Sequence, residues 1–301
     1  MSAIPSNKAA AAPGMLRRIS ASILGRGGSG RFPLLAFLFA LLLLVAALAG
    51  DSIAPYARDQ LDTTASLLPP FWSAEGSTAH LLGTDQLGRD LFSRLISGAR
   101  ISLMTGAAAI FVAGSIGVFL GLIAGYRGGL VGAAIMRMVD AFLALPFILL
   151  ALALISALGS GVGNIILVMI LTNWPRYARL VRSEVISIKE RDFVTLARIA
   201  GVGPTRIAFV HILPNAMSSI AVLAVLDIGR AIILEASLSF LGLGIQPPDV
   251  SWGLMLADGK TLMSFAWWLM AFPGITIVLA VMSFNAIGDW LKLRFDPRGQ
   301  L

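Results

Sequence analysis

Long apolar runs separated by short polar segments dominate the pattern of the chain. The first run spans residues 32–50, and five more lie near 101–125, 132–158, 163–183, 215–242 and 265–291. Each approaches the roughly 20 apolar residues that a helix needs to cross a bilayer. The pattern therefore predicts an all-α membrane protein with about six transmembrane helices.

Composition excludes a soluble domain. Hydrophobic residues make up 57% of the 301 residues and charged residues only 13%, about half the charged share of a typical soluble chain. The chain has no cysteine, which excludes a disulfide framework and a thiolate metal site.

The charges predict which segments lie on which side of the membrane. Residues 1–31 carry basic side chains and no acidic ones, whereas acidic side chains outnumber basic ones in 51–98. Basic residues between apolar runs are typical of cytoplasmic loops, so the net charge of +7 indicates topology rather than nucleic-acid binding. We expect a disordered cytoplasmic tail over 1–31, an external loop over 51–98 and a cytoplasmic tail over 293–301.

The first apolar run has an alternative interpretation as a cleaved signal peptide, because Ala47-Leu48-Ala49 resembles a signal-peptidase site. Its apolar core is longer than the 7 to 15 residues usual for such a signal. The length favours a first transmembrane helix over 32–50, followed after the external loop by a five-helix core over 99–292.

A polar island at 184–214 interrupts that core. Apolar residues at helical spacing predict an amphipathic helix over 191–200 that ends at Gly201: Phe193, Leu196, Ala197 and Ala200. Gly203 and Pro204 suit the start of a second short helix, which we expect Pro214 to end. Helices of about three turns are marginal in water, so this hairpin needs a partner surface, either the chain's own membrane domain or another protein.

The hairpin resembles the EAA loop of permease subunits of ATP-binding cassette (ABC) importers, in which a short helix docks on a cytoplasmic ATPase. The resemblance implies an ATPase-coupling loop made of Asp192, Thr195, Leu196, Ala197, Gly201, His211, Leu213 and Pro214. Thr195 and Leu196 replace the usual glutamate and alanine of that motif, which removes any salt bridge from the glutamate.

Two external stretches add to the resemblance. The segment GTDQLGRD at 83–90 is similar to a motif of C-type subunits in the dipeptide, oligopeptide and nickel permease family. Leu87, Leu91 and Leu95 at helical spacing predict a short surface helix there. The run EASLSFLGLGIQPPDVSWG at 235–253 resembles a second motif of the same subunits. We expect both stretches to meet the substrate-loaded binding protein through Arg89, Asp90 and Asp249.

Ionisable residues within spans are costly and are candidates for function. Asp227 and Arg230 have i, i+3 spacing and either neutralise each other or line a water-filled path. Glu235, Phe240 and Trp252 are further candidates for a pathway or gate. Asp140 is expected to pair with Arg137 at the inner surface.

Small residues and one proline predict local helix geometry. Gly117, Gly121 and Gly125 recur every four residues and predict close packing of the second span against another helix of the same subunit. Pro146 predicts a kink in the middle of the third span.

No enzymatic centre is expected. The two histidines, His80 and His211, are predicted on opposite sides of the membrane, which excludes a metal site or catalytic triad built from both. Gly259-Lys260-Thr261 lacks the glycine spacing of a phosphate-binding loop. We expect no cofactor in this chain, with ATP and Mg bound by partner subunits.

Together the motifs imply a type I ABC importer permease fold (MetI-like) in the bacterial inner membrane, with both termini cytoplasmic. The implied partners are a second permease subunit of B type, two ATPase subunits and an extracytoplasmic binding protein. Short peptides are the commonest cargo of such systems, and nickel, glutathione or another small solute is the alternative. A proton-coupled secondary transporter and an intramembrane protease are competing classes. The sequence shows no clear inverted repeat, which would support the transporter, and no GxGD sequence, which would support the protease.

Overall fold

A computed structural model describes residues 32–295 of the chain. Within this range all regular secondary structure is helical, apart from an isolated antiparallel bridge between Thr84 and Asp90. This confirms the all-α prediction. The predicted tail 1–31 and most of the tail 293–301 lie outside the described residues.

Each of the six predicted apolar runs corresponds to helix: α2 (Leu34–Ile53), α3 (Leu91–Arg127), the pair α4 (Gly129–Ala144) and α5 (Phe147–Leu158), α6 (Val162–Lys189), α9 (Leu213–Phe240) and α11 (Trp268–Phe295). Shorter elements connect them: η1 (Thr63–Ala65), α7 (Asp192–Ile199), α8 (Pro204–Arg206), η2 (Ile207–Ile212), α10 (Trp252–Gly259) and η3 (Lys260–Leu262).

Fewer than six of these helices satisfy a strict length and hydropathy criterion for a span. Among the described residues three do so alone, and a fourth is added when α4 and α5 are taken as one broken span. The apolar part of α2 is short, from Leu34 to Gly50. Helix α6 is long enough, but arginines follow Asn173 in its second half.

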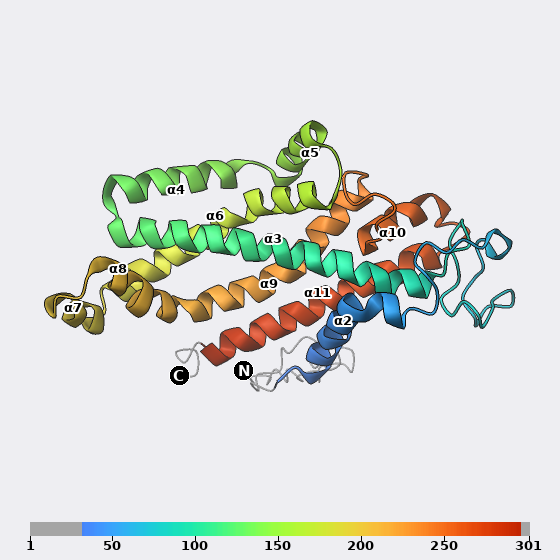
Figure 1. Ribbon diagram of the computed structural model, residues 1–301, viewed down its shortest axis with the longest axis horizontal. Helices are drawn as coiled ribbons and strands as arrows, with labels where there is room; N and C mark the ends of the chain where they lie inside the picture. The colour runs from blue at the N-terminus through green and yellow to red at the C-terminus, as the bar shows by residue number, and fades with distance from the viewer. Residues whose placement is uncertain (1–31, 296–301) are drawn as a thin grey trace, which may run out of the picture.

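The long helices lie side by side, and their connections gather at two ends (Figure 1). At one end lie α7, α8, the α3–α4 turn and the end of α11. The Phe32 and Trp290 rings meet edge to face, 5.1 Å between centroids, which places the start of α2 near that end too. The loop 54–90 and α10 occupy the opposite end. Successive loops therefore lie at alternating ends of the bundle, as predicted. Which end faces the cytoplasm stays a prediction.

Helices α3 and α6 pack closely because glycines line their contact. A Cβ atom at Gly121 would lie 2.6 Å from the Ala178 carbonyl oxygen, and one at Gly125 would lie 2.7 Å from Val185 Cβ. Gly117 of α3 packs against Trp174 and Tyr177 of α6. The predicted packing within the subunit is confirmed.

The third apolar run is broken rather than gently kinked. Helices α4 and α5 meet at 88°, and Leu145, which precedes Pro146, is extended with ψ 128°. A residue before proline is forced out of the helical region, and proline itself has no amide to continue the ladder. Pro146 therefore starts a new helix.

The separate surface helix expected around Leu87, Leu91 and Leu95 does not exist. Residues 81–90 form turns, and α3 begins directly at Leu91 with the Asp90 carboxylate accepting a hydrogen bond from the Ser93 amide. Leu91 and Leu95 are buried in the main core, because they face α2 and α10 instead of a membrane surface.

Pro214 does not end the second hairpin helix, as we had expected. Helical backbone runs without a break from Pro204 to Phe240, 37 residues in all. The π-helical turn η2 explains this: the Leu213 amide donates to the Ala208 carbonyl, five residues back. Such a wide turn provides room for a proline within a continuing helix.

Candidate functional site

The hairpin at one end of the bundle is closed by a left-handed glycine. Gly201 has φ +78°, and the amides of Gly201 and Val202 each donate at 3.1 Å, to the carbonyls of Arg198 and Ala197. These two bonds form the Schellman motif that terminates helices. The predicted C-cap at Gly201 is confirmed.

Within α7 (Asp192–Ile199), Val194 is the buried side chain that anchors the hairpin. Val194 is fully buried in a cluster with Val185 and Ile188 of α6 and Ile207 of η2. In contrast, Leu196 is 64% and Ile199 78% exposed. The hairpin therefore folds back on its own membrane domain through Val194, which was one of the two alternatives, and leaves other apolar side chains exposed. Docking on another protein stays a prediction.

The predicted coupling residues surround that outward surface. Exposed among them are Asp192, Thr195, Leu196, Gly201 and Pro214, while Ala197, His211 and Leu213 are partly buried. Phe209 and Val210 of η2 are exposed as well. We define the exposed apolar side chains Phe193, Leu196, Ile199, Phe209 and Val210 as the hairpin surface.

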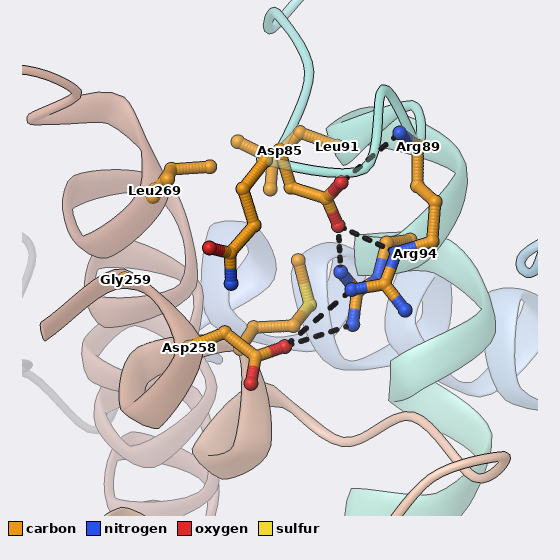
Figure 2. Close-up of a pocket in the computed structure, with 9 residues that line it drawn as sticks. Asp85, Arg89, Leu91, Arg94, Asp258, Gly259 and Leu269 are labelled. Carbon is orange, nitrogen blue, oxygen red and sulfur yellow. Dashed lines mark hydrogen bonds and ion pairs between the residues drawn. The ribbon is translucent and has the colours of Figure 1, made fainter. Parts of the chain in front are cut away.

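At the opposite end, four charged side chains join the loop 54–90 to α3 and α10. Figure 2 shows Asp85 between Arg89 and Arg94, with Asp258 of α10 on the far side of the two guanidinium groups. Arg89 Nε lies 2.7 Å from Asp85, Arg94 Nη2 lies 3.2 Å from Asp258, and Arg94 also pairs with Asp85. The two carboxylates balance the two guanidinium groups, and their ion pairs connect the loop to α3 and α10. We call these four residues the clamp.

The predicted receptor contacts fall into different environments at this end. Asp90 is buried, caps α3 and pairs with His80 at 3.0 Å, so it is not available to a receptor and that prediction is wrong. Arg89 is mostly enclosed by the clamp, and Asp249 is half-buried in the loop after α9.

Glu235 lies within a sealed polar network rather than along an open path. Its carboxylate accepts hydrogen bonds from the hydroxyls of Ser102, at 3.2 Å, and Ser239, at 2.8 Å. The Trp252 amide donates to Ser102, and its indole donates to the Leu95 carbonyl at 3.0 Å. Glu235 and Trp252 are both fully buried, so they hold α3, α9 and α10 together and do not line the path in this conformation.

The rest of the 235–253 run folds onto this network. Gly242 has φ +78° just after the end of α9, and the Ile245 amide donates to Ser239. Phe240 is partly buried, with the Lys260 ammonium 4.9 Å from its ring centroid. The loop after α9 is therefore compact, and these contacts are structural.

The charges predicted in the fifth span do pair, and a third group joins them. Asp227 of α9 is 1% exposed and lies 3.4 Å from Arg230 and 2.7 Å from Arg176 of α6. The sequence analysis missed Arg176 as a partner. The available indication was the position of Arg176, thirteen residues before the end of α6 and inside the predicted span.

Asp140 pairs with a residue other than the one expected. Its carboxylate lies 2.5 Å from the Arg179 guanidinium of α6, and both side chains are exposed. Arg137 has the right spacing in sequence, but the packing of α4 against α6 brings Arg179 closer. The prediction of an Arg137 partner is therefore wrong.

The geometry defines a class of protein: a multi-pass helical membrane protein with a short amphipathic hairpin at one end and charged groups paired between its spans. Residues 117–299 match the model of the family described as "Binding-protein-dependent transport system inner membrane component". The chain belongs to this family.

Curated relatives match over most of the chain. The "Di/tripeptide transport system permease protein DppC" of Pseudomonas aeruginosa is 43% identical over 261 residues, 87% of this chain and 86% of that protein. The "Glutathione transport system permease protein GsiD" of Pectobacterium atrosepticum is 42% identical over 264 residues, 87% and 86% of the two chains. The resemblance to C-type permease subunits is confirmed.

Among solved structures, a chain of the MetNI methionine ABC transporter in an inward-facing conformation is similar at 19% identity and a TM-score of 0.49. It covers 65% of this chain and 94% of that chain. Because this overlap is partial, family membership depends on the sequence matches.

Proposed function

We propose that this chain is one of two membrane subunits of a bacterial ABC importer that takes up short peptides delivered by an extracytoplasmic binding protein. The similarity to the di/tripeptide permease supports the substrate class, and the family description supports a binding-protein-dependent system. A B-type permease chain and two ATPase subunits, which bind ATP and Mg, complete the assembly. The chain itself catalyses no covalent chemistry.

The observation that carries this proposal is the hairpin surface at one end of the bundle. Five exposed apolar side chains within residues 193–210 are more than a water-facing surface usually carries without a binding partner. The hairpin is fastened to α6 by Val194 and continues directly into α9. Movement of a docked ATPase would therefore pull on two long helices at once, which couples ATP binding to the path.

There are alternatives for the cargo and one for the mechanism. The similarity to a glutathione permease favours a different small peptide-like solute moved by the same machinery, and nickel remains a further candidate of the resemblance. Proton-coupled secondary transport would use ionisable groups in the spans such as Asp227.

Reconstitution distinguishes these functions. We expect proteoliposomes holding the complete assembly to accumulate a labelled dipeptide only with ATP and the binding protein. Competition by glutathione or Ni²⁺ in the same assay tests the alternative cargoes. Uptake by this chain alone, driven by a proton gradient, would refute the ABC assignment.

The hairpin surface is tested by a single charge. Ile199→Asp should weaken binding of the ATPase subunits about tenfold or more, because an apolar contact is replaced by a desolvated carboxylate. Leu130→Asp, at an exposed leucine in the first turn of α4, is the matched control and should leave binding intact. Equal ATPase binding by the Ile199→Asp variant and the parent protein would show that this surface is not the docking site.

A further inference from the structure

Helix α6 carries a polar stripe that begins within the predicted span 163–183 and continues into the predicted hairpin segment as far as the C-cap residue of the helix. Six polar side chains recur at helical spacing and are all partly or fully exposed: Thr172, Arg176, Arg179, Ser183, Ser187 and Glu190. Steps of four and three residues keep them on one face of the helix. The opposite face of α6 buries Val181 and Val185.

The upper part of this stripe meets the charges of α9. Asp227 lies fourteen residues after Leu213 and thirteen before Phe240, so it is about 20 Å from either end of its helix at 1.5 Å per residue. Arg176 is 33% and Arg230 50% exposed, while the carboxylate between them is buried. Arg176 lies within the predicted span 163–183 and Arg230 within the predicted span 215–242, so two partly exposed guanidinium groups lie inside the predicted membrane region.

The charges do not cancel. Asp227 serves both Arg176 and Arg230, which leaves one positive charge in excess, whereas Arg179 is matched one to one by Asp140. Arg230 is the more exposed of the two arginines and lies farther from the carboxylate, 3.4 Å against 2.7 Å. The excess charge is thus concentrated at Arg230, held in place by Asp227.

A half-exposed guanidinium at this depth cannot face lipid tails, since a charge at the centre of a bilayer costs several kcal/mol. It faces either a partner subunit or a water-filled path. The centres of subunit interfaces are depleted in charged residues, and the polar stripe on α6 continues from Arg176 through Arg179 and Ser183 to the end of the predicted span. A polar face that extends from the charge cluster to the hairpin end of the span favours the path.

We propose that Arg230 and Arg176 form a subsite in the transport path that binds a carboxylate of the substrate as it passes, with Asp227 as the positioning residue. The planar guanidinium group matches a carboxylate with two parallel hydrogen bonds. Every free dipeptide carries such a group. This subsite deepens the proposed peptide transport and depends on it.

The test compares two labelled probes in the complete transporter: dialanine with a free C-terminal carboxylate and dialanine amide, which lacks that charge. Losing a hydrogen bond to a charged group should lower uptake of the free acid about tenfold in Arg230→Gln, with uptake of the amide much less affected. Arg230→Lys retains the charge and should recover part of the selectivity. Arg137→Gln, at an exposed arginine of α4 outside the cluster, should leave the ratio of the two probes unchanged.

Each other outcome contradicts the subsite in a distinguishable way. An unchanged ratio of acid to amide in Arg230→Gln would overturn the subsite while peptide transport stands. Failure of the Arg230→Gln chain to co-purify with the second permease subunit would place Arg230 at the subunit interface instead. If the parent transporter takes up neither probe, the proposed peptide transport is wrong, and the subsite, which depends on it, is wrong too.

Discussion

At the scale of single residues, small and buried side chains decide how closely the spans approach. Gly117, Gly121 and Gly125 allow α3 to lie against the backbone of α6, and Trp252 fills the space between α3 and α10 with both of its N–H groups bonded. The glycine spacing was visible in the sequence. The partners were not, because a repeat of four marks a helix face without specifying the helix that packs on it.

Replacing one of these glycines should separate the two helices. Gly121→Val adds a branched side chain where a Cβ alone would lie 2.6 Å from a carbonyl oxygen, and overpacking of this kind costs about 1–3 kcal/mol. We expect a lower thermal midpoint of the purified chain in detergent, measured by differential scanning fluorimetry. Gly163→Val, at a glycine whose Cβ position is open, is the control, and equal midpoints for the two variants would contradict close packing at Gly121.

At the scale of elements, the hairpin combines a firm anchor with a precise turn. Its helix, turn and anchoring residue all lie within 192–202, so the amphipathic spacing and the glycine were readable locally. Which apolar residue would be buried was not readable. Val194 was outside the predicted face yet is the residue enclosed, because the surface of α6 and η2 that receives it comes from elsewhere in the chain.

The turn itself can be tested without disturbing any contact. No atom lies within 4 Å of a Cβ placed on Gly201, so a substitution there acts only through its positive φ, at about 1–3 kcal/mol for a β-branched residue. Gly201→Val should reduce coupled ATPase activity and transport while membrane insertion persists.

Gly201→Asn is the control for this turn, since asparagine tolerates the left-handed conformation. We expect it to retain most transport in the same vesicle assay. If Gly201→Val transports as well as the parent protein, the geometry of this turn has no part in coupling.

At the scale of the whole molecule, contacts between distant segments tie the end opposite the hairpin into one unit. Asp85, Arg94 and Asp258 link the loop 54–90, α3 and α10, and the Trp268 indole of α11 donates to the Thr84 carbonyl at 3.1 Å. Thr84 and Asp85 of the 83–90 motif therefore connect the loop to α3 and α11 within the chain.

Breaking the clamp should loosen this end selectively. Arg94→Gln leaves the buried Asp85 carboxylate with fewer partners, and removing one member of a buried ion pair costs about 3–5 kcal/mol. We expect faster proteolytic cleavage within 54–90 in the purified chain. Glu75→Gln, at an exposed position of the same loop, should cleave at the parental rate, and a parental rate for Arg94→Gln as well would mean that the clamp does not hold the loop.

The sequence by itself determined the helical membrane class, the six helical regions, the hairpin and the family motifs, because hydropathy, helical period and turn residues are local properties of the chain. Only the tertiary structure decided that α3 begins at Leu91, that the helix after Gly203 passes through Pro214, and that Asp90 is enclosed. It also decided that Asp140 meets Arg179 and that Asp227 holds two arginines. Ion pairs and burial depend on which helices become neighbours, and that choice results from packing across distances that no local pattern records.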